Sequence, residues 1–180
     1  MISVKKIRAY FYRFFLRKKI QNLKVEREIV NMQNAQTIGI LYEATNPASN
    51  VIVNNFCKLL RQHNKEITML GYVDDKNNET IFGELLINKK NLTWHLQPVH
   101  AEVDRFIEKR FDILINAFIG ESLPLQYIAA LSNAKFRVGQ FIQNSTHCYE
   151  LMINIDKKLE LEYLLEQIAH FLNIINKSAD

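Results

Sequence analysis

Short apolar runs separated by polar segments recur along most of the chain, and each run has the length of one strand. Continuous runs of Val, Ile and Leu are typical of strands that are buried on both faces of a sheet. We expect five such strands, at residues 37–42, 66–73, 112–118, 136–141 and 149–155. Between them, apolar residues recur every three or four positions. This spacing predicts helices at 51–62, 101–110, 122–132 and 159–175.

Strands that alternate with helices indicate an α/β fold, with helices on both faces of a mostly parallel sheet. We expect a three-layer, Rossmann-like or flavodoxin-like sandwich of about five strands in the order 2-1-3-4-5. A chain of 180 residues fits one domain of this kind. Residues 35–180 are predicted to form it and residues 1–34 a helical extension. Residues 79–98 fit no pattern well, although 92–96 resembles an edge strand over which Trp94 would pack.

The extension has an unusual pattern of its own. Residues 3–30 contain no glycine or proline and predict a helix, with a break or bend near Asn22, since the pattern beyond it is weaker. At about 100° per residue, aromatic and aliphatic side chains fall on one arc of this helix and basic ones on the other. The apolar arc holds Ile7, Tyr10, Phe11, Phe14 and Phe15. The basic side chains expected to meet an anionic surface are Lys5, Lys6, Arg8, Arg13, Arg17, Lys18 and Lys19.

Charge is concentrated in the same segment. Residues 1–30 carry nine Lys or Arg and two Glu, a balance of +7, whereas the whole chain has +4, so the remainder carries −3. Such asymmetry points to an anionic partner: a membrane surface, RNA or an acidic protein. The alternative is that the apolar arc docks on the chain's own sheet or on a twin subunit in a homodimer, while the charges face water.

Several classes of function lack a signature. The five histidines are scattered, and Cys57 and Cys148 show no metal-ligand spacing, so both cysteines are interpreted as reduced thiols. Neither a Walker A nor a G-x-G-x-x-G motif occurs. We therefore assign no catalytic residue, metal or cofactor. Without a secretory signal or an apolar run of membrane length, the protein is expected in the cytoplasm, or peripherally at the inner membrane.

A second candidate site follows from the fold class. In open α/β sheets, ligands bind beyond the carboxyl ends of the strands, where the strand order reverses. Polar residues that would converge there are Glu43, Thr45, Asn46, Ser49, Asn116, Glu121 and Ser122. Free N–H groups at a helix start can hold an anion, which would suit a small enzyme or sensor for a nucleotide or phosphorylated metabolite. The simpler interpretation is that Thr45, Asn46 and Ser49 are turn and cap residues.

Four segments together carry a resemblance. They are 37–45 (TIGILYEAT), 111–115 (FDILI), 124–130 (PLQYIAA) and 134–139 (AKFRVG). With the basic N-terminal helix, they resemble a family of small uncharacterised proteins of Bacteroidota over nearly the whole chain. The resemblance implies a Rossmann-like fold and transfers no function. Residues 112–139 also resemble part of heptosyltransferase-type glycosyltransferases, but 180 residues leave no room for their second, nucleotide-sugar-binding domain.

Two functions from different classes therefore remain. The favoured hypothesis is a non-enzymatic binding or adaptor module that docks on an anionic surface through the basic helix. The alternative is the enzyme or sensor with its site at the strand ends. Whether the protein is an enzyme stays open at this point.

Overall fold

The computed structural model describes residues 4–76, 85–143 and 145–175. Its centre is a parallel sheet of six strands in the order β3-β2-β1-β4-β5-β6. The strands are β1 (Thr37–Glu43), β2 (Glu66–Val73), β3 (Leu85–Asn88), β4 (Ile113–Ala117), β5 (Phe136–Gln140) and β6 (Leu151–Ile153). The helices are α1 (Val4–Gln21), α2 (Pro47–Gln62), α3 (Ala101–Glu108), α4 (Leu123–Leu131) and α5 (Leu161–Ile174), with short 3-10 turns at η1 (Lys89–Asn91) and η2 (Thr146–Cys148).

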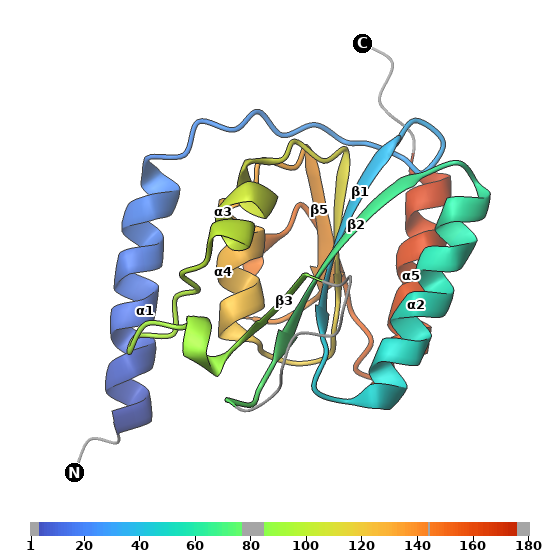
Figure 1. Ribbon diagram of the computed structural model, residues 1–180. Coiled ribbons are helices and arrows are strands. Elements are labelled where there is room, and N and C mark those ends of the chain that lie inside the picture. The colour runs from blue at the N-terminus through green and yellow to red at the C-terminus, as the bar shows by residue number, and fades with distance from the viewer. Residues whose placement is uncertain (1–3, 77–84, 144, 176–180) are drawn as a thin grey trace.

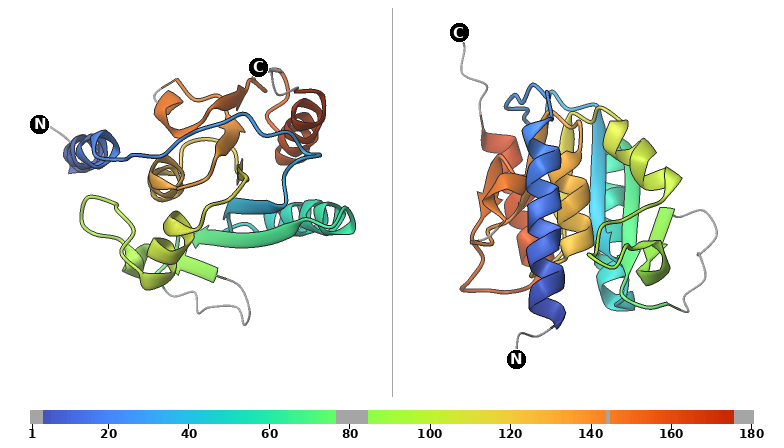
Figure 2. Two further views of the ribbon diagram at one scale, coloured as in Figure 1. Left: turned by 90° about the horizontal axis from the view of Figure 1, so that it is seen from above. Right: turned by 90° about the vertical axis from the view of Figure 1, so that its left-hand side faces the viewer.

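Helices cover both faces of the sheet, as Figure 1 shows. α2 and α5 lie on one face, α3 and α4 on the other, and α1 stands outside α4 (Figure 2). The predicted α/β sandwich is confirmed. The five expected strands follow the predicted order, and β3 extends the sheet by one strand beyond β2.

The expected edge strand at 92–96 is wrong. This segment closes on itself: the Leu96 amide donates to the Thr93 carbonyl at 3.0 Å, and the Thr93 amide donates to the Gln97 carbonyl at 2.9 Å. Leu96 has a φ of 66°, which extended chain does not adopt. Trp94 accordingly packs over no sheet edge, and 57% of its surface is exposed.

The first helix ends at Gln21, where a break or bend was expected near Asn22, and residues 23–30 are not helical. From there the chain crosses to β1, and its backbone groups bond to the body instead of to each other. The Glu28 amide donates to the Lys135 carbonyl at 3.1 Å, and the Met32 amide donates to the Leu172 carbonyl at 2.8 Å. Tertiary hydrogen bonds therefore override the helical propensity of this segment.

Other bounds shift for local reasons. α2 begins at Pro47 instead of Val51, because the Asn46 side chain accepts from the Ala48 amide at 2.9 Å and proline suits the first helical position. β6 is shorter than predicted, since it is an edge strand that pairs only with β5 over three residues. Within the described ranges, no helix is both long and apolar enough to cross a lipid bilayer.

A buried arginine joins the parts of the chain that meet beside β5. The Arg137 guanidinium donates to both carboxylate oxygens of Glu150, at 3.0 and 2.6 Å. It also donates to the carbonyls of Ala129 and Ala130, at 3.0 and 3.1 Å, where α4 ends. The segment that joins α1 to β1, residues 22–36, is called the crossing segment. Its Arg27 lies 3.8 Å from the same Glu150 carboxylate and also donates to the Ala134 carbonyl. Strand, helix end and crossing segment are thus tied at one point.

α1 is part of the fold and not an appendage. Tyr12 and Leu16 are each only 2% exposed and belong to the core cluster that includes the side chains of α4. The Tyr12 hydroxyl donates to the Leu123 carbonyl at 2.7 Å. Because α1 covers the outer side of α4, every residue of α4 from Pro124 to Leu131 is buried.

We expect Leu16→Ala to lower the free energy of unfolding by about 2–4 kcal/mol, because it opens a cavity between α1 and α4. Phe14→Ala on the same helix is the matched control. Its side chain is exposed, so the change should stay within about 1 kcal/mol. Urea denaturation of both variants measures the difference. Equal losses would show that α1 does not dock through Leu16.

At the opposite end of the sheet from the α4 N-terminus, Asp112 joins β4 to the start of β1. Its Oδ2 accepts from the amides of Gln36 and Thr37, at 2.9 and 3.0 Å, and Lys135 contacts its Oδ1 at 3.0 Å. Burial acts to raise the pKa of this carboxyl, but the hydrogen bonds from Thr37, Gln36 and Lys135 outweigh it and lower the pKa to about 2.

Because the folded pKa lies below the ordinary value of 3.8, the Asp112 carboxylate stabilises the protein above pH 4, and this contribution is lost as the pH falls through about 2. Asp112→Asn should lower the free energy of unfolding at pH 7 by about 1–2 kcal/mol, a figure reduced for partial exposure. Unfolding measured at several pH values should show the two proteins converge toward pH 2. A difference that does not depend on pH would contradict this origin.

Candidate functional site

The outward side of α1 carries large apolar side chains that the rest of the protein does not cover. Tyr10 is 66% exposed and Phe14 47%, and Ile7 and Val4 are exposed as well. Tyr12 and Leu16, which dock the helix, lie on the arc opposite Phe14. The contact with α4 therefore leaves the rings facing water. We call this surface the aromatic face; it comprises Val4, Ile7, Tyr10, Phe11, Phe14, Phe15 and Trp94.

Trp94 joins the aromatic face from the turn at 92–98. Its ring packs edge-on against Phe11 with centroids 5.2 Å apart, and the neighbouring His95 ring lies 5.0 Å from Phe15. The Arg8 guanidinium donates to the Trp94 carbonyl and holds the turn against the helix. No pattern along the chain predicts this partner, because Trp94 is far from α1 in the sequence and its contact forms only in the fold.

The basic side chains do not form the simple opposite arc that the helical pattern predicted, because the docking residues Tyr12 and Leu16 occupy its middle. Two of the cations turn inward: Arg8 binds the Trp94 carbonyl, and Lys19 donates to the Tyr127 hydroxyl at 2.5 Å. The exposed cations that flank or join the aromatic face are Lys6, Arg13, Arg17 and Lys18. The side chain of Lys5 lies outside the described residues.

Arg13 and Arg17 follow one edge of the aromatic face, and Phe11 and Phe15 follow the other. The Lys18 ammonium lies 5.6 Å from the Phe14 ring centroid, within the range of a cation–π contact. Rings and cations therefore reach solvent side by side along α1, which is the outermost element on this side of the molecule (Figure 2).

The second predicted site, at the carboxyl ends of the strands, is only partly assembled. Thr45 donates to the Glu43 carboxylate at 3.3 Å, and its hydroxyl oxygen accepts from the Asp74 amide at 2.8 Å. Burial raises the pKa of Glu43, and the charge of Asp74 raises it further, while the nearby hydroxyls of Ser122 and Thr45 act in the opposite direction. Glu43, Thr45 and Ser122 therefore lie close together at this end of the sheet.

The remaining predicted residues are placed differently. Asn46 caps α2, and Ser49 lies half-buried in the first turn of that helix. Asn116 is buried within β4, where its Nδ2 lies 3.4 Å from the Val138 carbonyl and its Oδ1 has no partner among the described residues. Glu121 is exposed. The cap interpretation holds for Asn46.

The charge at these strand ends is negative. Asp74 lies close enough for its charge to raise the pKa of Glu43, and the Lys89 ammonium is paired with Asp74 at 3.1 Å. An approaching phosphate would meet these two carboxylates, and the Lys89 ammonium beside them is already paired with Asp74. Nor do any three His, Cys, Asp or Glu in the described ranges gather in a way that could hold a metal ion.

A nucleophilic cysteine is not available either. Cys148 is fully buried, and burial raises the pKa of its thiol to about 12. Its Sγ donates to the Gln126 carbonyl at 3.6 Å. Cys57, also buried, has its pKa raised to about 11 for the same reason. At neutral pH both side chains are thiols that serve packing.

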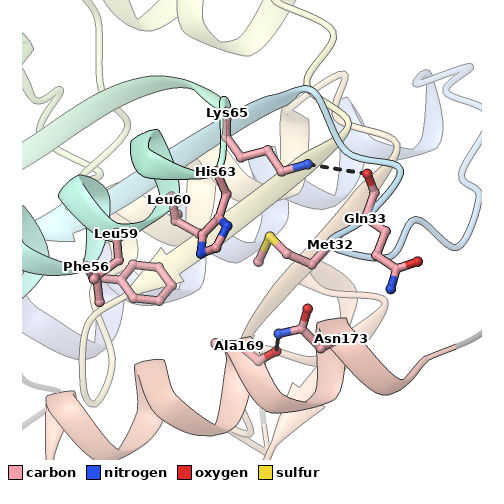
Figure 3. A pocket seen from close by; sticks show the side chains of 9 residues that line it. All are labelled: Met32, Gln33, Phe56, Leu59, Leu60, His63, Lys65, Ala169 and Asn173. Atoms are coloured by element: carbon pink, nitrogen blue, oxygen red, sulfur yellow. Dashed lines mark hydrogen bonds between the residues drawn. The ribbon is translucent and has the colours of Figure 1, made fainter.

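The sequence missed a groove on the other side of the sheet, between α2 and α5 (Figure 3). This groove encloses about 470 Å³ and is lined mostly by apolar side chains such as Phe56, Leu59 and Met32. Two of its polar side chains stabilise the fold: Lys65 donates to the Gln33 and Ala35 carbonyls, and Asn173 donates to the Ala169 carbonyl. One signal in the sequence was the number of apolar residues on α2, which include Phe56, Leu59 and Leu60, all of which line the groove.

The raised pKa of Glu43 has a measurable consequence. A carboxyl whose pKa in the folded protein exceeds its ordinary value of 4.5 costs stability when it ionises. The free energy of unfolding therefore falls as the pH rises from 4.5 through the raised pKa of the folded state. Glu43→Gln should therefore raise the free energy of unfolding at pH 7 and give no advantage at pH 4. The exposed Glu121→Gln serves as the control and should change little at either pH. A destabilised Glu43→Gln protein at pH 7 would show that the ionised carboxylate is needed.

The comparisons with known proteins give a family and no activity. No curated protein and no solved structure matches the chain significantly. The Bacteroidota origin that the resemblance suggested stays a prediction. One family matches residues 8–175, which include all but the first few residues of α1 and every strand and helix that follows. Because this match spans most of the chain, the protein belongs to the family of unknown function DUF6913.

Proposed function

We propose that this protein is a non-enzymatic adaptor that binds reversibly to an anionic membrane surface through the aromatic face and the cations beside it. The observation that carries the proposal is the orientation of α1: Tyr12 and Leu16 anchor the helix to α4, and the opposite side leaves Tyr10 and Phe14 exposed. A lone ring on a surface is ordinary, but a contiguous apolar patch rimmed by charge marks an interaction site. The cytoplasmic face of the inner membrane is the surface we propose.

The composition of this surface matches what a bilayer interface requires. Helices that lie in the interface bury apolar side chains to a depth of about 5–10 Å and keep Lys and Arg at the headgroups. Each cation near an anionic surface contributes about 1 kcal/mol. Arg13, Arg17 and Lys18 with the exposed Tyr10 and Phe14 would together support binding that is reversible and sensitive to salt.

RNA would use the same cations, but bases stack on the flat faces of aromatic rings. Here the rings of Tyr10 and Phe11 pack edge-on at 82°, as do those of Phe14 and Phe15 at 75°. The side chain of Ile7 is aliphatic, so a nucleic-acid base cannot stack on it. Lipid chains accept any apolar shape, so this face favours a membrane.

A second copy of the chain is a poorer partner for the same surface. The segment that bears α1 carries a balance of +7, and pairing two copies of α1 would bring like charges together. An anionic surface neutralises that charge instead. The negative field at Glu43 and Asp74 likewise gives the alternative, a site for a nucleotide or phosphorylated metabolite, no support.

The test is co-sedimentation of the full chain with phosphatidylcholine vesicles, with and without phosphatidylglycerol. We expect binding only to the anionic vesicles, with a blue shift of Trp94 fluorescence. Phe14→Ser should weaken the partition by about tenfold, which corresponds to about 1.4 kcal/mol. Leu59→Ser, on α2, is the matched control: Leu59 is 58% exposed but lies across the sheet, and its variant should bind like the wild type.

Point variants are preferred to removal of α1, because the deletion would uncover α4 and confuse binding with unfolding. Retention on single-stranded RNA instead of vesicles would overturn the membrane assignment. A dimer by light scattering that dissociates in Phe14→Ser, without vesicle binding, would assign the aromatic face to self-association. Equal partition of Phe14→Ser and Leu59→Ser would show that the aromatic face is not the contact.

A further inference from the structure

A small hollow lies between α1 and the η2 turn, at one edge of the aromatic face. Arg13, Leu16, Arg17 and His147 line it, and it encloses about 140 Å³. Arg13 and Arg17 stand one helical turn apart, so their guanidinium groups project from the same side of α1. Within the described part of the chain, neither of them has an ion pair or a hydrogen bond.

Positive charge gathers around this hollow without compensation. Like charges four residues apart on a helix repel each other and destabilise it slightly, and no carboxylate is among the lining residues. The buried side chain of Leu16 forms an apolar wall, which reduces the screening that water would provide. The arrangement costs stability in the free protein and would gain from an anion.

His147 completes the set of donors. Burial lowers the pKa of its imidazole, and the positive charges of Arg137 and Arg17 lower it further. The ring is therefore neutral at pH 7 and can still donate one N–H hydrogen bond. Nη2 of Arg137 donates to the His147 carbonyl at 3.4 Å and also to the Glu150 carboxylate. The same arginine therefore fixes the backbone of the η2 turn.

We propose that the hollow lined by Arg13, Arg17 and His147 binds a single phosphate monoester, presented by a lipid headgroup. A guanidinium matches two phosphate oxygens with its fork of donors, and three donor side chains suit the three free oxygens of a monoester. The volume is well below the roughly 300–1,000 Å³ of sites for cofactors or drug-sized ligands. It leaves room for a phosphate group and excludes a whole nucleotide.

The position of the hollow decides the source of the phosphate, and on this point alone the inference rests on the proposed function. Arg13 is next to Phe14 in the chain, and Arg17 lies one turn further along the same edge. When the ring of Phe14 enters the interface, the hollow opens at the depth of the headgroups. Lipid phosphate can therefore reach it without leaving the bilayer.

The first experiment compares vesicles that contain phosphatidate with phosphatidylglycerol vesicles of matched surface charge. The full chain should bind phosphatidate vesicles several-fold more tightly. Arg17→Gln should abolish this preference, while it weakens the binding to phosphatidylglycerol only as much as the loss of any one cation beside the aromatic face does. Lys18→Gln is the matched control: it removes the same charge from the adjacent residue, whose ammonium faces Phe14 and not the hollow, and should weaken both bindings equally.

The second experiment titrates the protein with inorganic phosphate and follows the His147 ring by NMR. Phosphate should shift its resonances and raise its pKa in the wild type and in Lys18→Gln, but not in Arg17→Gln. Thermal unfolding confirms that each variant is folded. An Arg17-dependent phosphate response without vesicle binding supports the hollow and overturns the proposed function. Vesicle binding without a phosphatidate preference, together with an unmoved His147, overturns the hollow and leaves the proposed function standing.

Discussion

The hydrogen-bonded ion pair between Arg137 and Glu150 is the constraint on which the placement of α1 and α4 depends. A buried guanidinium is tolerated only when its donors are satisfied, and here two carboxylate oxygens and the carbonyls at the end of α4 satisfy them. The same carboxylate receives Arg27, whose pKa burial and the charge of Arg137 lower to about 10. These contacts hold the crossing segment beside β5. They thereby position α1 on the outer side of α4.

The sheet was accessible from the sequence because its strands are buried on both faces and contain continuous apolar runs. The runs at β1, β2 and β4 have no competing interpretation at that length. The short edge strands were harder. β3 has only four residues and β6 three, and no alternation marks which face of such a strand meets the core.

The candidate surfaces were predictable where one helix contains them and unpredictable where the fold assembles them. The rings of α1 and their cations follow from a 100° period. What the period could not show is which side docks, since only Tyr12 and Leu16 mark it and both sit among basic residues. The addition of Trp94 and His147 depends on turns whose position is set by tertiary hydrogen bonds. Those contacts form only in the folded chain, and no periodicity along the sequence predicts them.

The layered build also determines which way the protein would face on a bilayer. α1 and the α2–α5 pair lie on opposite sides of the sheet (Figure 2). With the outer side of α1 against lipid, the groove walled by Phe56 and Leu59 would point away from the membrane, with the sheet between them as a rigid spacer. One side would then hold the protein in place while the other stays open to the aqueous interior.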